Sequence, residues 1–237
     1  MTLFLLILSG FTPNKAWASF VFYLAFILPI ILGLSYIILS GKLYNRSYPK
    51  LLKPGGRVLL SLNLSAPAIS AVMLAAYLTT VLMTALGYEA SPGVYDNFPL
   101  HILTSALLPA LLEETLYRYI PMKLLLPENG RMCVILSAVS FSLIHLDLFK
   151  MPYALTAGLI FILIDIYAQS VIPSVIIHFM NNLLSLTVSY GYLKNFYPVG
   201  LTVTLSLLCA VSLAVVLIKR RSFKGFFSPL FSGRADC

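Results

Sequence analysis

Residues 59–87 read LLSLNLSAPAISAVMLAAYLTTVLMTALG and contain no Asp, Glu, Lys or Arg. A helix needs about 20 predominantly apolar residues to cross the hydrocarbon core of a bilayer, so this stretch is long enough to span a membrane. The whole 237-residue chain has the same character, with 59% hydrophobic and only 10% charged residues. Soluble globular chains carry about 25% charged residues, so this composition excludes a disordered, fibrous or ordinary soluble protein. The sequence predicts a polytopic membrane protein.

The same length criterion, applied along the chain, predicts seven membrane spans, and the apolar N-terminus allows an eighth. The predicted fold class is therefore an all-α transmembrane bundle of about seven to eight helices that encloses a polar intramembrane cavity. The loops are too short to hold another domain, so residues 1–237 form a single transmembrane domain. The seven spans are expected at residues 18–40, 59–87, 100–126, 132–149, 152–169, 171–192 and 199–218.

The N-terminal run MTLFLLILSGFT, residues 1–12, has two interpretations. Together with Ala16-Trp17-Ala18 it resembles a signal peptide with a small-residue cleavage site. A signal peptide normally starts with a basic region, and no basic residue precedes this apolar run. We therefore prefer a short membrane-dipping segment.

The net charge of +8 arises mainly from basic residues that lie between the apolar runs. This placement indicates the positive-inside rule rather than nucleic-acid binding. The basic segment 42–57 and the tail 219–224 should both be cytoplasmic, as should Lys123 and Arg131. The 88–99 loop has two acids and no Lys or Arg, as expected for the opposite face. The predicted orientation is N-terminus out and C-terminus in.

The three cysteines, Cys133, Cys209 and Cys237, form no CxxC pair and no metal-binding spacing. They therefore indicate neither a disulfide nor a zinc site. Cys237 is the last residue given, with no aaX sequence after it, so it is not itself a prenylation site.

Three predicted spans contain polar side chains where charge is costly, and such residues are candidates for function. The segments are LLPALLEETLYRYIP at 107–121, SFSLIHL at 140–146 and VIIHFMNN at 175–182. Asp165 lies in the fifth predicted span, where it should face the bundle interior or a polar loop, and we assign it no role. His101 lies near a membrane end, where we interpret it as interfacial. The candidates in the three segments are Glu113, Glu114, Arg118, His145, His178, Asn181 and Asn182.

Helical spacing sorts these candidates into pairs, because residues at i and i+4 are neighbours on a helix. Glu114 can pair with Arg118, and this pair is equally compatible with a folding clamp. Glu113 is rotated by about 100° from Glu114 and is left without that partner. His178 and Asn182 present an imidazole and an amide to one spot. Phe141 places an apolar wall one turn from His145, although a single membrane histidine is commonly only an interhelical hydrogen bond.

This inventory suits hydrolysis of an amide by water. A partly desolvated carboxylate can act as a general base near neutral pH, and a histidine can share the proton or orient the water. A second imidazole and an amide can donate hydrogen bonds to a developing oxyanion. The serine-hydrolase pattern GxSxG and the zincin pattern HExxH are both absent from the sequence.

Three motifs resemble the CAAX prenyl protease and bacteriocin-processing family of intramembrane proteases, often called CPBP or Abi. E-E-x-x-x-R is matched by Glu113, Glu114 and Arg118; F-x-x-x-H is matched by Phe141 and His145; and H-x-x-x-N is matched by His178 and Asn182. The motifs follow the family's order over about residues 100–192, which would be the protease core.

The resemblance implies a glutamic protease in which Glu113 and His145 activate water and His178 and Asn182 stabilise the oxyanion. Glu114 and Arg118 would support the shape of the site. The family also carries a metalloprotease label, and Glu113, His145 and His178 could hold zinc by residue type. We predict no cofactor, because Asn182 suits an oxyanion donor better than a zinc ligand.

The expected function is therefore that of an intramembrane endopeptidase acting on a membrane-embedded or membrane-anchored peptide or protein. The compact chain with short loops resembles bacterial family members, which predicts a multi-pass protein of the bacterial plasma membrane. A proton-coupled transporter using Glu113, His145 and Asp165, or a non-catalytic immunity or scaffold protein, remains an alternative. The sequence places Glu113, His145 and His178 at different membrane depths, so a common site requires tilted or offset helices. It specifies neither the substrate nor the oligomeric state.

Overall fold

The computed structural model describes residues 15–40, 56–88, 97–191 and 199–219, and these contain helices and no strand. The predicted all-α class is therefore confirmed. The N-terminal run 1–12, the basic segment 42–55 and the tail after residue 219 lie outside the described residues. The helical elements are α2 (Lys15–Leu39), α3 (Gly56–Leu62), α4 (Ser65–Ala85), α5 (Phe98–His101), η1 (Ile102–Leu107), α6 (Leu108–Glu114), η2 (Thr115–Tyr119), α7 (Ile120–Leu124), α8 (Gly130–Leu143), α9 (Met151–Ala168), α10 (Ile172–Ser189) and α11 (Val199–Ile218).

Each of the seven predicted spans corresponds to one helical segment, with α3 and α4 forming one segment and α5 to α7 another. By length and hydropathy, three described helices are long enough to cross a membrane: 57–85, 151–168 and 172–189. The apolar helix α8, with 14 residues, is shorter than a full span. The prediction of a helix over 132–149 is thus wrong at its C-terminal end. The helical membrane bundle is supported, whereas the number of spans stays a prediction.

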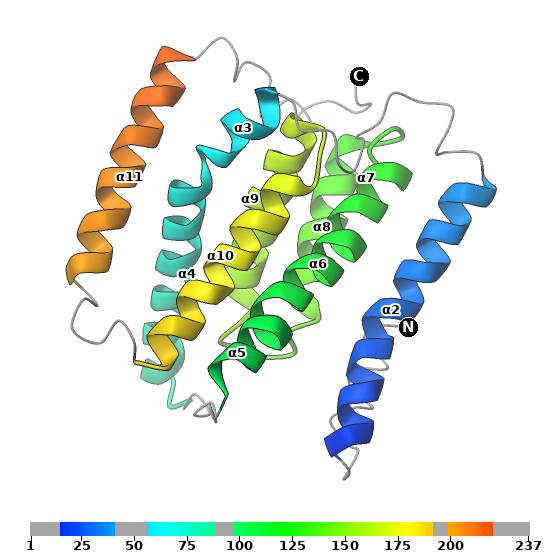
Figure 1. The fold of residues 1–237 in the computed structure, drawn as a ribbon, viewed down its shortest axis with the longest axis horizontal. Helices are drawn as coiled ribbons and strands as arrows, with labels where there is room; N and C mark the ends of the chain where they lie inside the picture. The colour runs from blue at the N-terminus through cyan, green and yellow to red at the C-terminus, as the bar shows by residue number, and fades with distance from the viewer. Residues whose placement is uncertain (1–14, 41–55, 89–96, 192–198, 220–237) are drawn as a thin grey trace.

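The helices run alternately up and down, so the bundle has two ends (Figure 1). At one end, which we call the α5 end, α4, α8 and α10 finish and α5, α9 and α11 begin. At the other, the α7 end, α2, α7, α9 and α11 finish and α3, α8 and α10 begin. α11 packs beside α4 at one side of the bundle, and α2 contacts the α6–α7 region at the other.

The continuous segment from Phe98 to Leu124 contains two π-helical turns, η1 and η2, one on each side of α6. In both turns the hydrogen bond has i→i+5 spacing: Leu108 N–H donates to Leu103 O, and Ile120 N–H donates to Thr115 O. A proline follows each turn closely, at Pro109 and Pro121. Proline has no N–H, so it cannot donate to the carbonyl four residues earlier, which favours a local departure from α-helix.

One carbonyl released in this way has a partner on a neighbouring helix. Pro121 cannot donate to the carbonyl of Tyr117, and that oxygen instead accepts a hydrogen bond from the buried Ser137 hydroxyl of α8. The bond joins the compound helix to α8 close to the glutamates, and it satisfies a backbone group that lipid could not.

α8 and α9 pack closely because small residues face each other. A Cβ added at Gly158 of α9 would lie 2.9 Å from Ala138 Cα and 3.1 Å from Ala138 O on α8. Small residues let membrane helices approach closely in this way. The contact sets the spacing of Phe141 on α8 and Phe161 on α9, both of which lie in the buried core.

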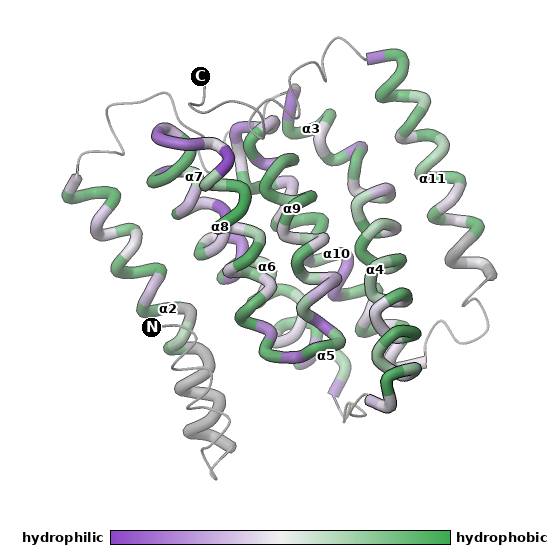
Figure 2. The backbone as a smooth tube through the Cα atoms, turned by 180° about the vertical axis from the view of Figure 1, so that it is seen from behind, coloured by the Kyte–Doolittle hydropathy of each residue, from purple (hydrophilic) through white to green (hydrophobic). Residues whose placement is uncertain are grey.

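Hydrophobic residues predominate along most of the helices, as the colouring of Figure 2 shows. Large hydrophobic side chains are exposed there, including Tyr36 on α2, Tyr77 and Leu78 on α4, and Leu207 and Leu217 on α11. An exposed apolar surface of this extent would be a liability in water and is what a lipid-facing surface requires.

Candidate active site

A cavity of about 490 Å³ lies between the helices, and all four predicted catalytic side chains line it. Its wall combines these polar groups with apolar residues from α4 and α9. Glu113, His145 and His178, which the sequence places at different membrane depths, thus reach one cavity. The lining residues are Val72, Met73, Ala76, Ser105, Pro109, Glu113, Phe141, His145, Lys150, Tyr153, Ala154, Ala157, Phe161, His178, Asn181, Asn182, Ser185, Leu186 and Ser189.

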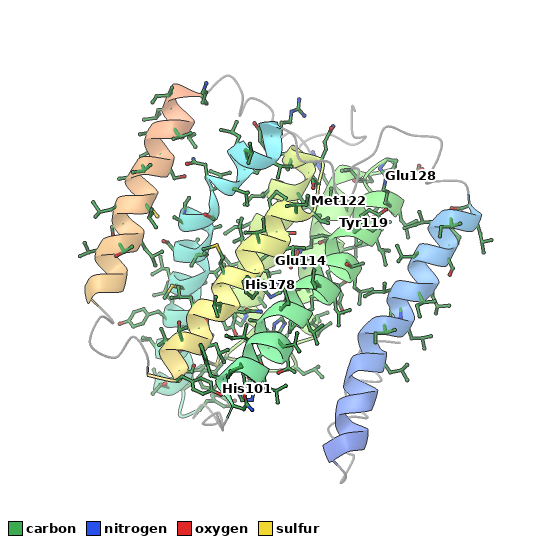
Figure 3. The ribbon with its side chains drawn as sticks, in the orientation of Figure 1. His101, Glu114, Tyr119, Met122, Glu128 and His178 are labelled. Atoms are coloured by element: carbon green, nitrogen blue, oxygen red, sulfur yellow. The ribbon has the colours of Figure 1, made fainter. Side chains whose placement is uncertain are left out.

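The centre of the site is an imidazole held between two carboxylates. His178 Nδ1 lies 2.7 Å from Glu114 Oε1, and His178 Nε2 lies 4.0 Å from Glu113 Oε2. Glu114 is completely buried, whereas Glu113 and His178 retain 8% and 6% exposure. Glu114 therefore orients the ring from behind, and the other ring nitrogen faces Glu113. Figure 3 shows Glu114 and His178 side by side between α6 and α10.

Arg118 balances the charge of this group. Its Nε lies 3.1 Å from Glu114 Oε2, as the spacing in the sequence predicts, and both side chains are fully buried. Within the part of the chain described, the two terminal guanidinium nitrogens have no hydrogen-bond partner. The guanidinium instead lies over the Phe141 ring, with Cζ 3.9 Å from the ring centroid. A cation over an aromatic face is stabilised electrostatically, so the motif phenylalanine covers the motif arginine.

His145 lies beyond the helix on which the sequence places it. α8 ends at Leu143, and His145 follows in a turn, where its Nδ1 lies 2.9 Å from the carbonyl oxygen of Phe141. The predicted contact with Phe141 is present, with the two ring centroids 5.2 Å apart. Because a neutral ring that donates from Nδ1 has a lone pair on Nε2, this hydrogen bond selects the tautomer that can accept a proton from water.

Local hydrogen bonds explain why α8 ends early. Asp147 accepts from the Phe149 N–H through Oδ1, and its carbonyl accepts from the N–H of Met151. Leu146 adopts a left-handed conformation, with φ of 48°. Pro152 then starts α9 at a position that tolerates proline. This Asp–Pro spacing was the signal in the sequence that could have placed the end of α8.

A buried carboxylate, Asp165, fixes the start of α10. Asp165 Oδ1 accepts from the Ser174 N–H at 3.1 Å, and Asp165 Oδ2 lies 2.6 Å from the Ser174 hydroxyl. Both residues are completely buried. The early N–H groups of a helix have no partner within the helix, so Asp165 supplies one. Ser174 precedes His178 by one turn, so this contact anchors the helix that carries His178.

Asn182 and its neighbour Asn181 both line the cavity from α10. His178 and Asn182 therefore reach the same cavity, as their spacing predicts. His101 lies at the α5 end of the bundle, as the interfacial interpretation expects (Figure 3), and its Nδ1 is 2.8 Å from the Tyr190 hydroxyl. The structure thus brings all the predicted site residues together, and their catalytic roles stay predictions.

A metal site is not evident in the described ranges. Among the described residues, no group of three or more His, Cys, Asp or Glu side chains is arranged to hold a metal ion. This includes the alternative zinc ligands Glu113, His145 and His178. Two potential donor atoms are engaged elsewhere, since His145 Nδ1 bonds a carbonyl and His178 Nδ1 bonds Glu114. This donor set does not fit a zinc ion as arranged, and we derive no step through a metal.

Comparison with known proteins identifies the central part of the chain. Residues 95–184 match the family model described as Type II CAAX prenyl endopeptidase Rce1-like, a family of proteases that hydrolyse peptide bonds. The matched range contains all three motifs and extends from α5 to residue 184 in α10. Comparison with curated proteins and with solved structures finds no match. Residues 95–184 are thus similar to the Rce1-like CAAX prenyl endopeptidases, which supports the resemblance that the three motifs indicate.

Proposed function

We propose that this protein is an intramembrane endopeptidase that uses a glutamate-activated water to cut a membrane-associated peptide or protein. The observation that carries the proposal is the single cavity into which Glu113, His145, His178 and Asn182 all project from three separate parts of the chain. The match of residues 95–184 to a protease family supports the same reaction class.

Glu113 is the proposed general base. It lies in the cavity wall, it is nearly buried, and its nearest charged partner is the edge of His178 rather than a lysine or arginine. Arg118 is already engaged by Glu114. Glu113 takes a proton from water as the water oxygen attacks the scissile carbonyl carbon. His145, whose free Nε2 can accept a hydrogen bond, orients that water.

His178 and Asn182 are the proposed oxyanion donors. Because His178 Nδ1 already bonds Glu114, the ring donates from Nε2 only when both nitrogens are protonated. The two oxygens of Glu114 serve two partners, since Oε1 accepts from His178 Nδ1–H and Oε2 pairs with Arg118 Nε. The negative charge on the tetrahedral carbonyl oxygen then receives hydrogen bonds from His178 Nε2–H and the Asn182 amide.

Collapse of the tetrahedral intermediate completes the reaction. The carbon–nitrogen bond breaks, and the proton held by Glu113 passes to the departing amine. One water is consumed, and the products are a carboxylic acid and an amine, so no oxidant, reductant or cofactor enters the balance. Arg118 and Phe141 keep Glu114 and His178 in place without touching the substrate.

The test begins by finding a substrate. Membranes from cells that produce the wild-type chain or Glu113→Gln are compared by mass spectrometry of newly formed peptide ends, and a peptide spanning a difference becomes the substrate. We expect kcat to fall by about 10²–10⁴-fold in Glu113→Gln, as for loss of a general base, and by about 10²–10³-fold in Asn182→Ala, as for loss of an oxyanion donor. Asn181→Ala is the matched control, because it is the adjacent amide in the same wall.

Unchanged cleavage by a folded Glu113→Gln chain would refute the proposal. The same variants separate the alternatives. A proton-coupled transporter predicts flux in proteoliposomes that depends on Glu113, without formation of new peptide ends. A scaffold predicts that Glu113→Gln retains full function in cells.

A further inference from the structure

The wall of the cavity changes from buried to exposed toward one end of the bundle. Glu113 and His178 are nearly buried, whereas Ser105, Lys150 and Ser189 are exposed. These exposed lining residues lie in η1, directly before α9, and at the last position of α10. All three positions belong to the α5 end (Figure 1). No described lining residue comes from α3, from α7 or from the first turn of α10. The cavity therefore opens at the α5 end.

The basic residues of the chain are distributed very unequally between the two ends. Three of the 16 Lys and Arg, namely Lys15, Lys150 and Lys194, belong to the α5 end or to the segment that joins α10 to α11 there, and Arg118 lies in the site. The others belong to the α7 end or to segments that start or finish there. They are Lys42, Arg46, Lys50, Lys53, Arg57, Lys123, Arg131, Lys219, Arg220, Arg221, Lys224 and Arg234.

Lys and Arg near membrane ends mark the cytoplasmic side, so the α7 end is cytoplasmic and the α5 end is not. We propose that the candidate active site opens to the non-cytoplasmic side of the membrane and receives its substrate from there. This assignment of the substrate rests on the proposed peptidase function. The substrate class is a peptide segment of an exported or membrane-anchored protein that lies on the non-cytoplasmic side. A cleavage site confined to the cytoplasm does not reach this opening.

The composition of the opening suits access from water. Lys150 and Asp147 form an ion pair there at 3.5 Å, with 53% and 34% of their side chains exposed. Ser105, Ser185 and Ser189 add hydroxyl groups to the cavity wall around the same end. A charged pair and three hydroxyls at one rim provide a polar path for water and for the peptide backbone to reach Glu113. Farther from the α5 end, the cavity wall is formed by buried residues such as Phe161 and His178.

The side of the opening can be measured without any substrate. Single cysteines are introduced by Ser189→Cys at the rim and, as the matched control, by Glu128→Cys, an exposed residue at the α7 end (Figure 3). Cys209 and Cys237 are replaced by serine, and Cys133 stays because it is completely buried. Right-side-out and inside-out vesicles are treated with a membrane-impermeant maleimide, and the labelled fraction of each cysteine is measured.

We expect Ser189→Cys to label at least tenfold faster in right-side-out than in inside-out vesicles, and Glu128→Cys to show the reverse. The proposal is overturned if both patterns are inverted, or if Ser189→Cys reacts only after detergent, since the rim would then face lipid. Labelling requires no catalysis, so an inactive chain with the expected pattern refutes the proposed function alone. An active chain with the inverted pattern refutes only the sidedness.

Discussion

The contact between Asp165 and Ser174 yields a prediction that separates hydrogen bonding from charge. Asp165→Ala removes both acceptors from Ser174. The Ser174 hydroxyl keeps a partner, because its Oγ is also 3.0 Å from the carbonyl oxygen of Val171. The Ser174 N–H keeps none, since it lies in the first turn of α10 and is completely buried.

The expected cost follows from these contacts. Losing two hydrogen bonds to a buried carboxyl group and leaving one N–H unpaired should lower the free energy of unfolding by about 2–4 kcal/mol. Asp165→Asn should cost less than about 1 kcal/mol, because the amide oxygen still accepts from the Ser174 N–H. The amide nitrogen can donate to Ser174 Oγ, which then donates to Val171 O. Every polar group therefore keeps a partner.

The assay is reversible unfolding in mixed micelles of a mild detergent and dodecyl sulfate, followed by far-ultraviolet circular dichroism. Cleavage activity, once a substrate is identified, provides a second readout: Asp165→Ala should lower kcat at least tenfold by loosening the start of the helix that carries His178, and Asp165→Asn should preserve it. Equal stability of Asp165→Ala and the wild type would refute the anchoring argument. Equal damage by both variants would show that the charge, rather than the hydrogen bonds, is what the fold requires.

Three further predictions concern the site and its supports. Arg118→Met should destabilise the protein by about 3–5 kcal/mol, because Glu114 is then buried without its cation. Adding Glu114→Gln should recover part of that loss in the same unfolding assay. Equal stability of the single and double variants would contradict this. Gly158→Ala should lower the free energy of unfolding by about 1–3 kcal/mol, because the new Cβ meets the α8 backbone. Leu159→Ala, at an exposed position of the same helix, is the control. An unchanged stability of Gly158→Ala would show that α8 can move away without cost. Chelation by 1,10-phenanthroline should leave cleavage unchanged, and a loss that zinc restores would assign Glu113, His145 and His178 to a metal after all.

The sequence alone predicted the elements that depend on local apolar character. Runs such as 59–87 have no alternative to a membrane helix, so the helical segments appear where they were expected. The end of α8 was misjudged because the residues after Leu143 stay apolar while hydrogen bonds of Asp147 turn the chain. Hydropathy does not detect such turn chemistry.

Side-chain pairs within one helix of the site could be predicted from their spacing, whereas contacts between helices could not. Glu114 and Arg118 are four residues apart on one helix, so their pair could be inferred. The contact between Glu114 and His178 joins residues 64 positions apart, and no periodicity encodes it. The pairing of Asp165 with Ser174 was missed for a related reason, because it depends on how the short connection between α9 and α10 turns back.

The two π-helical turns have a consequence for how this membrane segment tolerates changes in length. Each turn accommodates one more residue than an α-helical turn would. The seven-residue helix α6 therefore lies between two points at which the helical register shifts by one residue. In an uninterrupted helix, inserting or deleting one residue rotates everything beyond it by about 100°. Here the deletion of one residue at 102–107 or 115–119 can convert the π-helical turn into an α-helical turn locally. The direction in which Glu113 and Glu114 point is thereby separable from the length of the helical segment 98–124.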